Sequence, residues 1–143
     1  MNISTNRCLH AALAVAMACC MFSTASADES PFNFSLRSHE GREWSDEDFK
    51  DKDIVIVAFL GTECPLVKLY GPRLQRLQEE YADHVQVIGI NANTQDSMTE
   101  MSAYAERHDV RFPLLKDVGN KVADQFKAER TPEVFEEGSG RSP

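Results

Sequence analysis

The chain has 143 residues, of which 23 are acidic and 15 are basic, so its net charge is -8. This length provides for one domain with a modest hydrophobic core. The acidic excess argues against nucleic acid or an anionic membrane surface as the binding partner.

Residues 1–27 have the pattern of a secretory signal peptide. A single arginine supplies positive charge near the start, an apolar stretch follows over 9–22, and small residues end the segment at Ala27. The apolar stretch is too short for a membrane span. Lipid attachment at Cys19 or Cys20 is the alternative, but the residue three positions before Cys19 is not the leucine that this modification favours. We therefore expect export, to the periplasm or outside the cell, after cleavage near Ala27 rather than lipoprotein anchoring.

Cleavage at this site would remove three cysteines and leave Cys64 alone. An exported chain with one cysteine has no internal disulfide, so its thiol is either buried and inert or free and reactive. The place of Cys64 in the fold therefore decides how the sequence is interpreted.

The segment after the signal peptide begins with weak secondary-structure patterns and continues with a clear strand pattern. Residues 28–53 are polar and broken, with a possible short strand at 32–37 and a turn or short helix at 45–49. Residues 53–61, DIVIVAFLG, form a nearly continuous apolar run rich in β-branched residues. Such a run is typical of a strand that is covered on both faces.

Helical periodicity begins directly after Cys64. The segment 65–84 has leucines at helical spacing, and Gly71-Pro72 within it predicts a kink or a short break. The elements that follow are a buried strand at 85–91, a helix at 94–109 with Asp96 or Ser97 as its N-cap, a short strand at 111–117 and a final helix at 118–129.

Strands that alternate with helices at this spacing form βαβ units with right-handed crossovers. The sequence therefore predicts an α/β fold with a mainly parallel central sheet. Functional sites in such sheets lie beyond the carboxyl ends of the strands, which is where Cys64 stands.

Cys64 marks the junction between the first buried strand and the following helix. The unpaired N–H groups and the dipole at a helix N-terminus favour the thiolate, which is the nucleophilic form of cysteine. Pro65 suits the first helical position, Lys68 would add positive charge one turn later, and Glu63 would oppose it. The alternative is a small buried thiol that fills a gap in the core.

Five segments carry a family resemblance: AFLGTECPLVKLYGPRL, VQVIGINAN, FPLLKD, a helix with VADQF, and RTPEVF. Over residues 31–135 they resemble the thioredoxin-like superfamily, and within it the redoxin branch of alkyl hydroperoxide reductase and thiol-specific antioxidant (AhpC/TSA) proteins. The resemblance implies a three-layer αβα sandwich with Cys64 as the redox nucleophile. It also implies that Pro132 follows a cis peptide bond and faces Cys64, while the backbone of Thr131 binds substrate. The alternative for Thr131-Pro132 is an ordinary helix-terminating turn.

The residues around Cys64 depart from the patterns of this superfamily. Val67 stands where a thioredoxin-type dithiol has its second cysteine, and Lys68 stands where copper chaperones have theirs. The threonine that peroxiredoxins place three residues before the cysteine is Gly61 here, and Thr62 lies one residue off. Cys64 therefore has no internal resolving partner, and an external thiol must release the product of its reaction with a disulfide or a peroxide.

The C-terminal segment also departs from the family pattern. Residues 136–143, EEGSGRSP, lack apolar alternation, and we expect a disordered tail there. The thioredoxin-like domain would then span 28–135 and lack the final β-hairpin and the C-terminal helix, as in a truncated product. One edge and one face of the sheet would be uncovered.

Other residue groups give weak support for a metal or cofactor site. His39, His84 and His108 are scattered without ligand spacing. The acidic stretch 45–53 lacks the glycine and the terminal glutamate of a calcium loop. We therefore expect neither a metal nor a cofactor.

The sequence favours an exported thiol oxidoreductase or antioxidant protein that acts through Cys64. Its partners would be an external thiol, a disulfide-bearing protein or a peroxide. The alternative is a thioredoxin-fold binding or adaptor module without turnover, or an inactive truncated paralogue. The other residues expected at the site are Thr62, Pro65, Thr131 and Pro132 in the substrate groove, with Glu63 and Lys68 tuning its charge.

Overall fold

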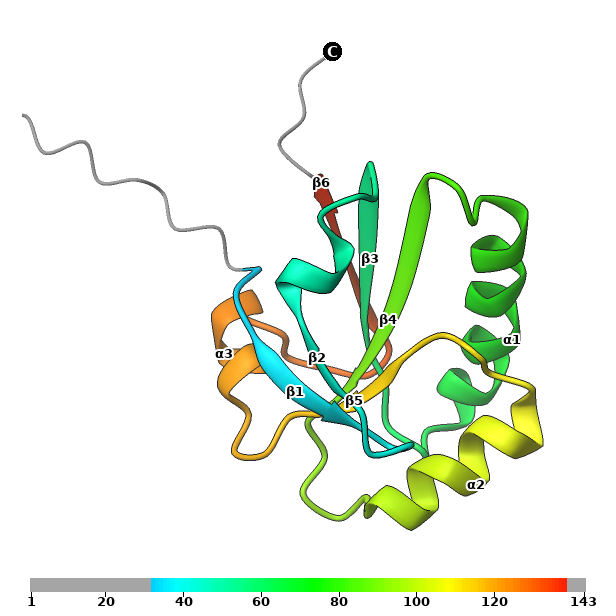
Figure 1. Cartoon of the computed structure of the whole chain (residues 1–143). Coiled ribbons are helices and arrows are strands. Elements are labelled where there is room, and N and C mark those ends of the chain that lie inside the picture. The colour runs from blue at the N-terminus through cyan, green and yellow to red at the C-terminus, as the bar shows by residue number, and fades with distance from the viewer. Residues whose placement is uncertain (1–31, 139–143) are drawn as a thin grey trace, which may run out of the picture.

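A computed structural model describes residues 32–138 of the chain (Figure 1). The predicted signal peptide at 1–27 and residues 139–143 of the predicted tail lie outside this described part. None of the helices that it contains has the length and apolar character needed to cross a membrane.

The described chain alternates strands and helices much as the periodicity predicts. The predicted turn or short helix at 45–49 contains a 3₁₀ helix, and the short strand predicted at 32–37 begins three residues later and ends one residue later. In chain order the elements are β1 (Ser35–Ser38), β2 (Glu43–Ser45), the 3₁₀ helix η1 (Asp46–Phe49), β3 (Ile54–Phe59), α1 (Pro65–Glu80), β4 (Val85–Asn91), α2 (Met98–His108), β5 (Leu114–Lys116), α3 (Lys121–Phe126) and β6 (Glu133–Gly138).

The strands form one mixed sheet in the order β2-β1-β5-β4-β3-β6. The pairs β3–β4 and β4–β5 are parallel, whereas β1–β2, β1–β5 and β3–β6 are antiparallel. The prediction of a mainly parallel sheet therefore holds at its centre and is wrong for its flanks. The flanking strands are short or polar, and periodicity does not reveal their direction.

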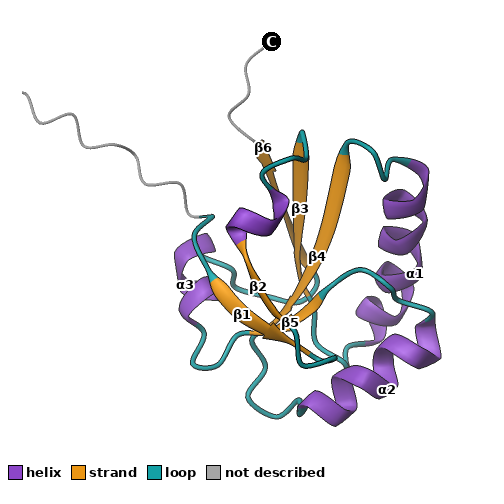
Figure 2. Ribbon diagram, in the orientation of Figure 1, coloured by secondary structure: helices purple, strands orange, loops and turns teal. Residues whose placement is uncertain are grey.

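Helices cover both faces of the sheet and give it three layers (Figure 2). On one face, α1 and α2 pack through Val67 and Met101 against Ala58 of β3. On the other face, α3 packs through Phe126 against Phe59 of β3. Because β3 is apolar on both faces, it contributes to both cores, and Cys64 follows it at the carboxyl end.

Helix α1 is continuous from Pro65 to Glu80, so the chain has no break at Gly71-Pro72. The glycine is required instead by the neighbouring helix, because a Cβ on Gly71 would overlap the hydroxyl of Tyr104 in α2. That hydroxyl donates a hydrogen bond to the carbonyl oxygen of Val67 over 2.9 Å. Burial raises the pKa of Tyr104 to about 12, so the group stays a donor. Tyr104 thereby fixes the first turn of α1, which begins beside Cys64.

Strand β6 corrects the prediction of a disordered tail from residue 136 and of a domain that ends at 135. The strand continues to Gly138 and pairs with β3 along its whole length, from Phe59↔Glu133 to Ile54↔Gly138. Phe135 alone packs firmly, against Phe59 and Phe126. Backbone pairing, which needs no apolar alternation, forms this strand. The predicted lack of the rest of the final β-hairpin and of the C-terminal helix concerns the chain after Gly138, which lies outside the described residues.

Candidate functional site

Cys64 lies where the chain leaves β3 and enters α1. It is the N-cap residue of α1 with extended backbone angles, φ -68° and ψ 121°, and Pro65 begins the helix. The side chain is half-buried. Its sulfur takes no part in capping the helix, because no side-chain hydrogen bond links it to the first N–H groups.

The thiol instead contacts the loop between α3 and β6. Cys64 Sγ donates a hydrogen bond to the carbonyl oxygen of Thr131 over 3.4 Å, across 67 residues of sequence. The peptide bond between Thr131 and Pro132 is cis. The two motifs that the resemblance pairs are therefore in contact.

The contact joins the sulfur to an oxygen that can only accept a hydrogen bond. The N–H groups that begin α1 are donors of the same chain segment, and donors of this kind favour a thiolate.

A carboxylate from β6 holds the loop that carries Thr131. Glu133 Oε2 accepts hydrogen bonds from the backbone N–H groups of Glu129 at 2.7 Å and Arg130 at 3.2 Å. All three residues lie at the protein surface or are partly exposed. The loop before the cis-proline is therefore stabilised locally, by a residue of its own turn.

A second carboxylate holds the loop that carries Cys64. Asp96, directly before the N-cap of α2, accepts the backbone N–H of Thr62 at its Oδ2 over 2.8 Å. Asp96 is 4% exposed and Thr62 is 7% exposed. The Thr62 hydroxyl is buried near the same carboxylate but makes no hydrogen bond of normal geometry in the described structure.

Asp96 belongs to a polar network at the carboxyl ends of β4 and β5. Its Oδ2 also accepts from Asn91 Nδ2 at 2.6 Å and Asn93 Nδ2 at 3.4 Å. Lys116 Nζ donates to the Asp96 carbonyl oxygen at 2.7 Å and to Asn91 Oδ1 at 3.1 Å. Burial alone would raise the pKa of Asp96, but the hydrogen bonds from Asn91 and Thr62 outweigh it and lower that pKa. The group is therefore an anion at neutral pH.

The remaining predicted site residues lie on the first turn of α1 or just before it. Glu63 is exposed and Lys68 is half-buried. Val67, at the position of the missing second cysteine, is fully buried in the core with Tyr104. A thiol at that position would therefore be enclosed in the core.

Sequence reasoning missed the network behind Cys64. It considered Asp96 only as a possible helix cap, a role that Ser97 fills, and it gave no role to Asn91 or Lys116. The available signal was positional, because Asn91 ends β4 and Lys116 ends β5. Polar residues that end buried parallel strands face the functional edge of the sheet.

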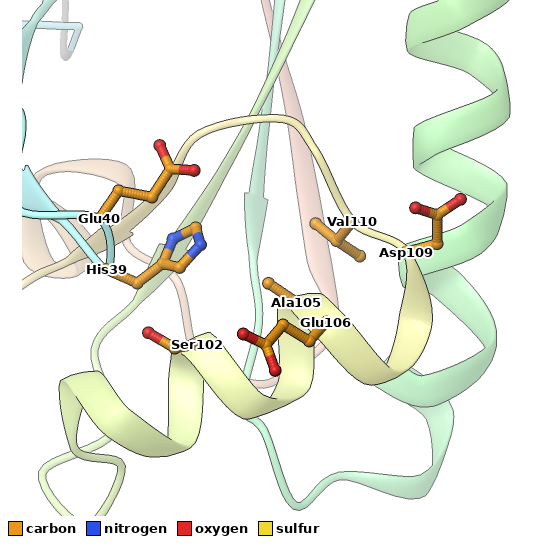
Figure 3. A pocket seen from close by; sticks show the side chains of 7 residues that line it. All are labelled: His39, Glu40, Ser102, Ala105, Glu106, Asp109 and Val110. Carbon is orange, nitrogen blue, oxygen red and sulfur yellow. The ribbon is translucent and has the colours of Figure 1, made fainter.

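A separate hollow of about 300 Å³ lies between α2 and the turn after β1 (Figure 3). Cys64 is not part of its lining. Within residues 32–138 no group of three or more potential ligands is arranged to hold a metal ion. The hollow is lined by His39, Glu40, Ser102, Ala105, Glu106, Asp109 and Val110.

Comparison with known proteins agrees with this geometry. The AhpC/TSA family model matches residues 27–142. A thioredoxin-like protein of Bacillus subtilis, YneN, is 34% identical over 93 residues, which cover 64% of this chain and 54% of that protein. A chloroplastic peroxiredoxin Q of Sedum lineare is 28% identical over 107 residues, which cover 74% and 56% of the two chains. The chain thus spans about half the length of the curated relatives it matches.

Solved structures place the fold in the same group. The hypothetical protein SMc02350 from Sinorhizobium meliloti superposes with a TM-score of 0.71 at 29% identity, over 76% of this chain and 63% of that one. Disulfide oxidoreductases and thioredoxin-like proteins of lower identity share the fold as well. The architecture is therefore the thioredoxin-like α/β fold.

Proposed function

The chain belongs to the AhpC/TSA family, and on that premise we propose that it is an exported thiol oxidoreductase whose nucleophile is Cys64. One observation carries the proposal: Cys64 Sγ lies 3.4 Å from the carbonyl oxygen of Thr131, beside the cis peptide bond to Pro132. A disulfide presented along this loop would meet the sulfur directly.

The proposed reaction is thiol–disulfide exchange. The Cys64 thiolate attacks one sulfur of a substrate disulfide, a mixed disulfide with Cys64 forms, and the other substrate sulfur leaves as a thiolate. Cys64 is the only cysteine among residues 32–138. An external thiolate then attacks the mixed disulfide and releases Cys64, so the cycle depends on a partner that carries a thiol.

A peroxide is the second candidate substrate, because the hydroxyl of Thr62, two residues before Cys64 in the sequence, is buried and has no hydrogen-bond partner of normal geometry. In that reaction the thiolate takes one oxygen of the peroxide and becomes a sulfenic acid, while the alkoxide or hydroxide leaves. An external thiol would then condense with the sulfenic acid and release water. The similarity to peroxiredoxin Q supports this candidate as well.

Mass spectrometry of the full chain tests both reactions. The chain is treated with a stoichiometric model disulfide or with hydrogen peroxide, and peptide mapping identifies the modified cysteine. We expect an adduct on Cys64 with the disulfide, and no adduct on this peptide in C64S. Sulfenylation of Cys64 without a disulfide adduct would select the peroxide reaction, and lack of both would favour a binding module without turnover.

Export is the remaining part of the proposal. It is supported by the pattern of residues 1–27. The intact mass of the protein recovered from an exporting host should correspond to a chain that begins near Asp28. Recovery of the uncleaved chain inside the cell would contradict export.

A further inference from the structure

We propose that Asp96 is a positioning residue for Cys64, because its carboxylate fixes the backbone of the loop between β3 and α1 through the N–H of Thr62. Asp96 does not touch the reacting sulfur. The inference deepens the proposed thiol chemistry and rests on Cys64 as the nucleophile.

The first support is the burial of the contact. The hydrogen bond from Thr62 N–H to Asp96 Oδ2 measures 2.8 Å, and both residues are more than nine-tenths buried. Water therefore does not compete for this donor. If the carboxylate were removed, the N–H would be left unsatisfied, and the loop would move to find another acceptor.

The second support is that Asp96 itself is held from two strands. Asn91 at the end of β4 donates to the same oxygen over 2.6 Å, and Lys116 at the end of β5 donates to the Asp96 carbonyl over 2.7 Å. The carboxylate is therefore an anchor fixed to the parallel centre of the sheet. It transmits the rigid geometry of β4 and β5 to the loop that follows β3.

The third support is the tight turn that this anchor holds. Cys64 N–H donates to the Gly61 carbonyl over 3.2 Å. A Cβ on Gly61 would lie 2.8 Å from Asn93 Nδ2 and 3.4 Å from Thr131 Oγ1. The turn is thus confined between Asn93 and Thr131, with Asp96 fixing its central amide. A shift of this turn would move Sγ relative to Thr131, and displacements of about 1 Å cost catalysis roughly a hundredfold in well-ordered sites.

The chemistry of the contact supplies a matched pair of variants. An asparagine at position 96 keeps an oxygen that accepts the Thr62 N–H, whereas an alanine removes every acceptor. If Asp96 acts by positioning, D96N should preserve most of the reactivity that D96A loses. Glu100, in the exposed capping box of α2, provides the control substitution E100Q, since it carries a nearby charge without touching the loop.

The experiment measures the reaction of Cys64 with a model disulfide in the full chain, by peptide mapping over time, alongside alkylation by iodoacetamide. We expect D96A to slow the disulfide reaction roughly tenfold, and D96N to stay within about threefold of the unmodified chain. E100Q should react at the unmodified rate. Amide hydrogen exchange at Thr62 should be slow in the unmodified chain and in D96N.

Three outcomes would overturn the inference. These are an unchanged rate in D96A, equal slowing in D96A and D96N, or fast exchange of the Thr62 amide in the unmodified chain. The last remains measurable even where D96A fails to fold, and a slowing well beyond threefold in D96N would then also count against the inference. Failure of the proposed function is distinguishable, because the unmodified chain would then be alkylated at Cys64 without reacting with the disulfide.

Discussion

The two loops that meet at Cys64 are each held by a carboxylate, but in opposite ways. Asp96 is buried and binds the amide of Thr62 across 34 residues of sequence. Glu133 is partly exposed and binds amides three and four residues before it, in its own turn. The nucleophile is therefore anchored by a tertiary contact inside the protein, whereas the proline loop is anchored by a local contact at the surface.

This difference determines how strongly the loss of its carboxylate should destabilise each loop. When a buried N–H loses its acceptor, the protein loses the full desolvation free energy of that group, whereas an exposed N–H forms a hydrogen bond with water instead. The loop of Cys64 should therefore be rigid and sensitive to substitution of its anchor. The loop of Pro132 should adjust more easily, as is useful for a segment along which a substrate is proposed to lie.

The largest expected effect is that of D96A on stability. It leaves the Thr62 amide and the Asn91 side chain without a buried acceptor, and we expect it to lower the free energy of unfolding by about 3 kcal/mol. Chemical denaturation of the full chain measures this value. The matched control is E106A, which removes an exposed carboxylate of α2, the helix that follows Asp96, and should change the value by less than about 0.5 kcal/mol. A loss below about 1 kcal/mol in D96A would contradict the role of the buried anchor.

Acid pH should weaken the same anchor. The folded chain lowers the pKa of Asp96 below its ordinary value of 3.8. Its contribution to stability is therefore complete above that value and is lost as the pH falls through the lower pKa of the folded state. Lys116 favours the anion and Glu100 opposes it.

Unfolding curves of the unmodified chain and D96N isolate this contribution, since the other acids are common to both. Because carboxyl groups titrate mainly below about pH 5, the difference in unfolding free energy between the unmodified chain and D96N should be constant from about pH 5 to about pH 7. It should shrink below about pH 4. A difference that grows as the pH falls would show that Asp96 is not held as an anion.

The sequence predicts the contact between the two loops better than it predicts what holds them. The pairing of Cys64 with Pro132 is what the family resemblance implies, since Thr131-Pro132 alone fits an ordinary helix-terminating turn. Asp96 and Lys116 do not stand out, because single polar residues after buried strands resemble ordinary caps and loops. Their role depends on which strands are neighbours, and the order β5-β4-β3 is a property of the sheet.

The edge strands show the same limit of prediction from sequence. The buried strands β3 and β4 are predicted well because their apolar runs record burial on both faces. β6 is held by hydrogen bonds to β3, three of its six residues are glutamates, and its one firmly packed side chain is Phe135. A polar edge strand therefore resembles a tail until its partner is known.

A smaller effect is expected where the two loops touch each other. G61A would place a Cβ 2.8 Å from Asn93 Nδ2 and 3.4 Å from Thr131 Oγ1. Because the exposed Asn93 amide can move aside, we expect a loss of about 1 kcal/mol in unfolding free energy and slower disulfide exchange at Cys64. G138A, whose Cβ would meet nothing within 4 Å, is the matched control and should leave both values unchanged. Equal behaviour of the two variants would mean that the turn is not confined.

The smallest effect is expected for E133A, the counterpart of D96A in the other loop. The N–H groups of Glu129 and Arg130 are at the surface, so water replaces the lost carboxylate. We expect a loss of about 0.5 kcal/mol in denaturation, little more than for E136A on the same strand. The hydrogen exchange of both amides should accelerate in E133A while that of Thr62 stays slow. A loss comparable to that of D96A would show that the proline loop is as rigidly anchored as the nucleophile, and the contrast between the two loops would then fail.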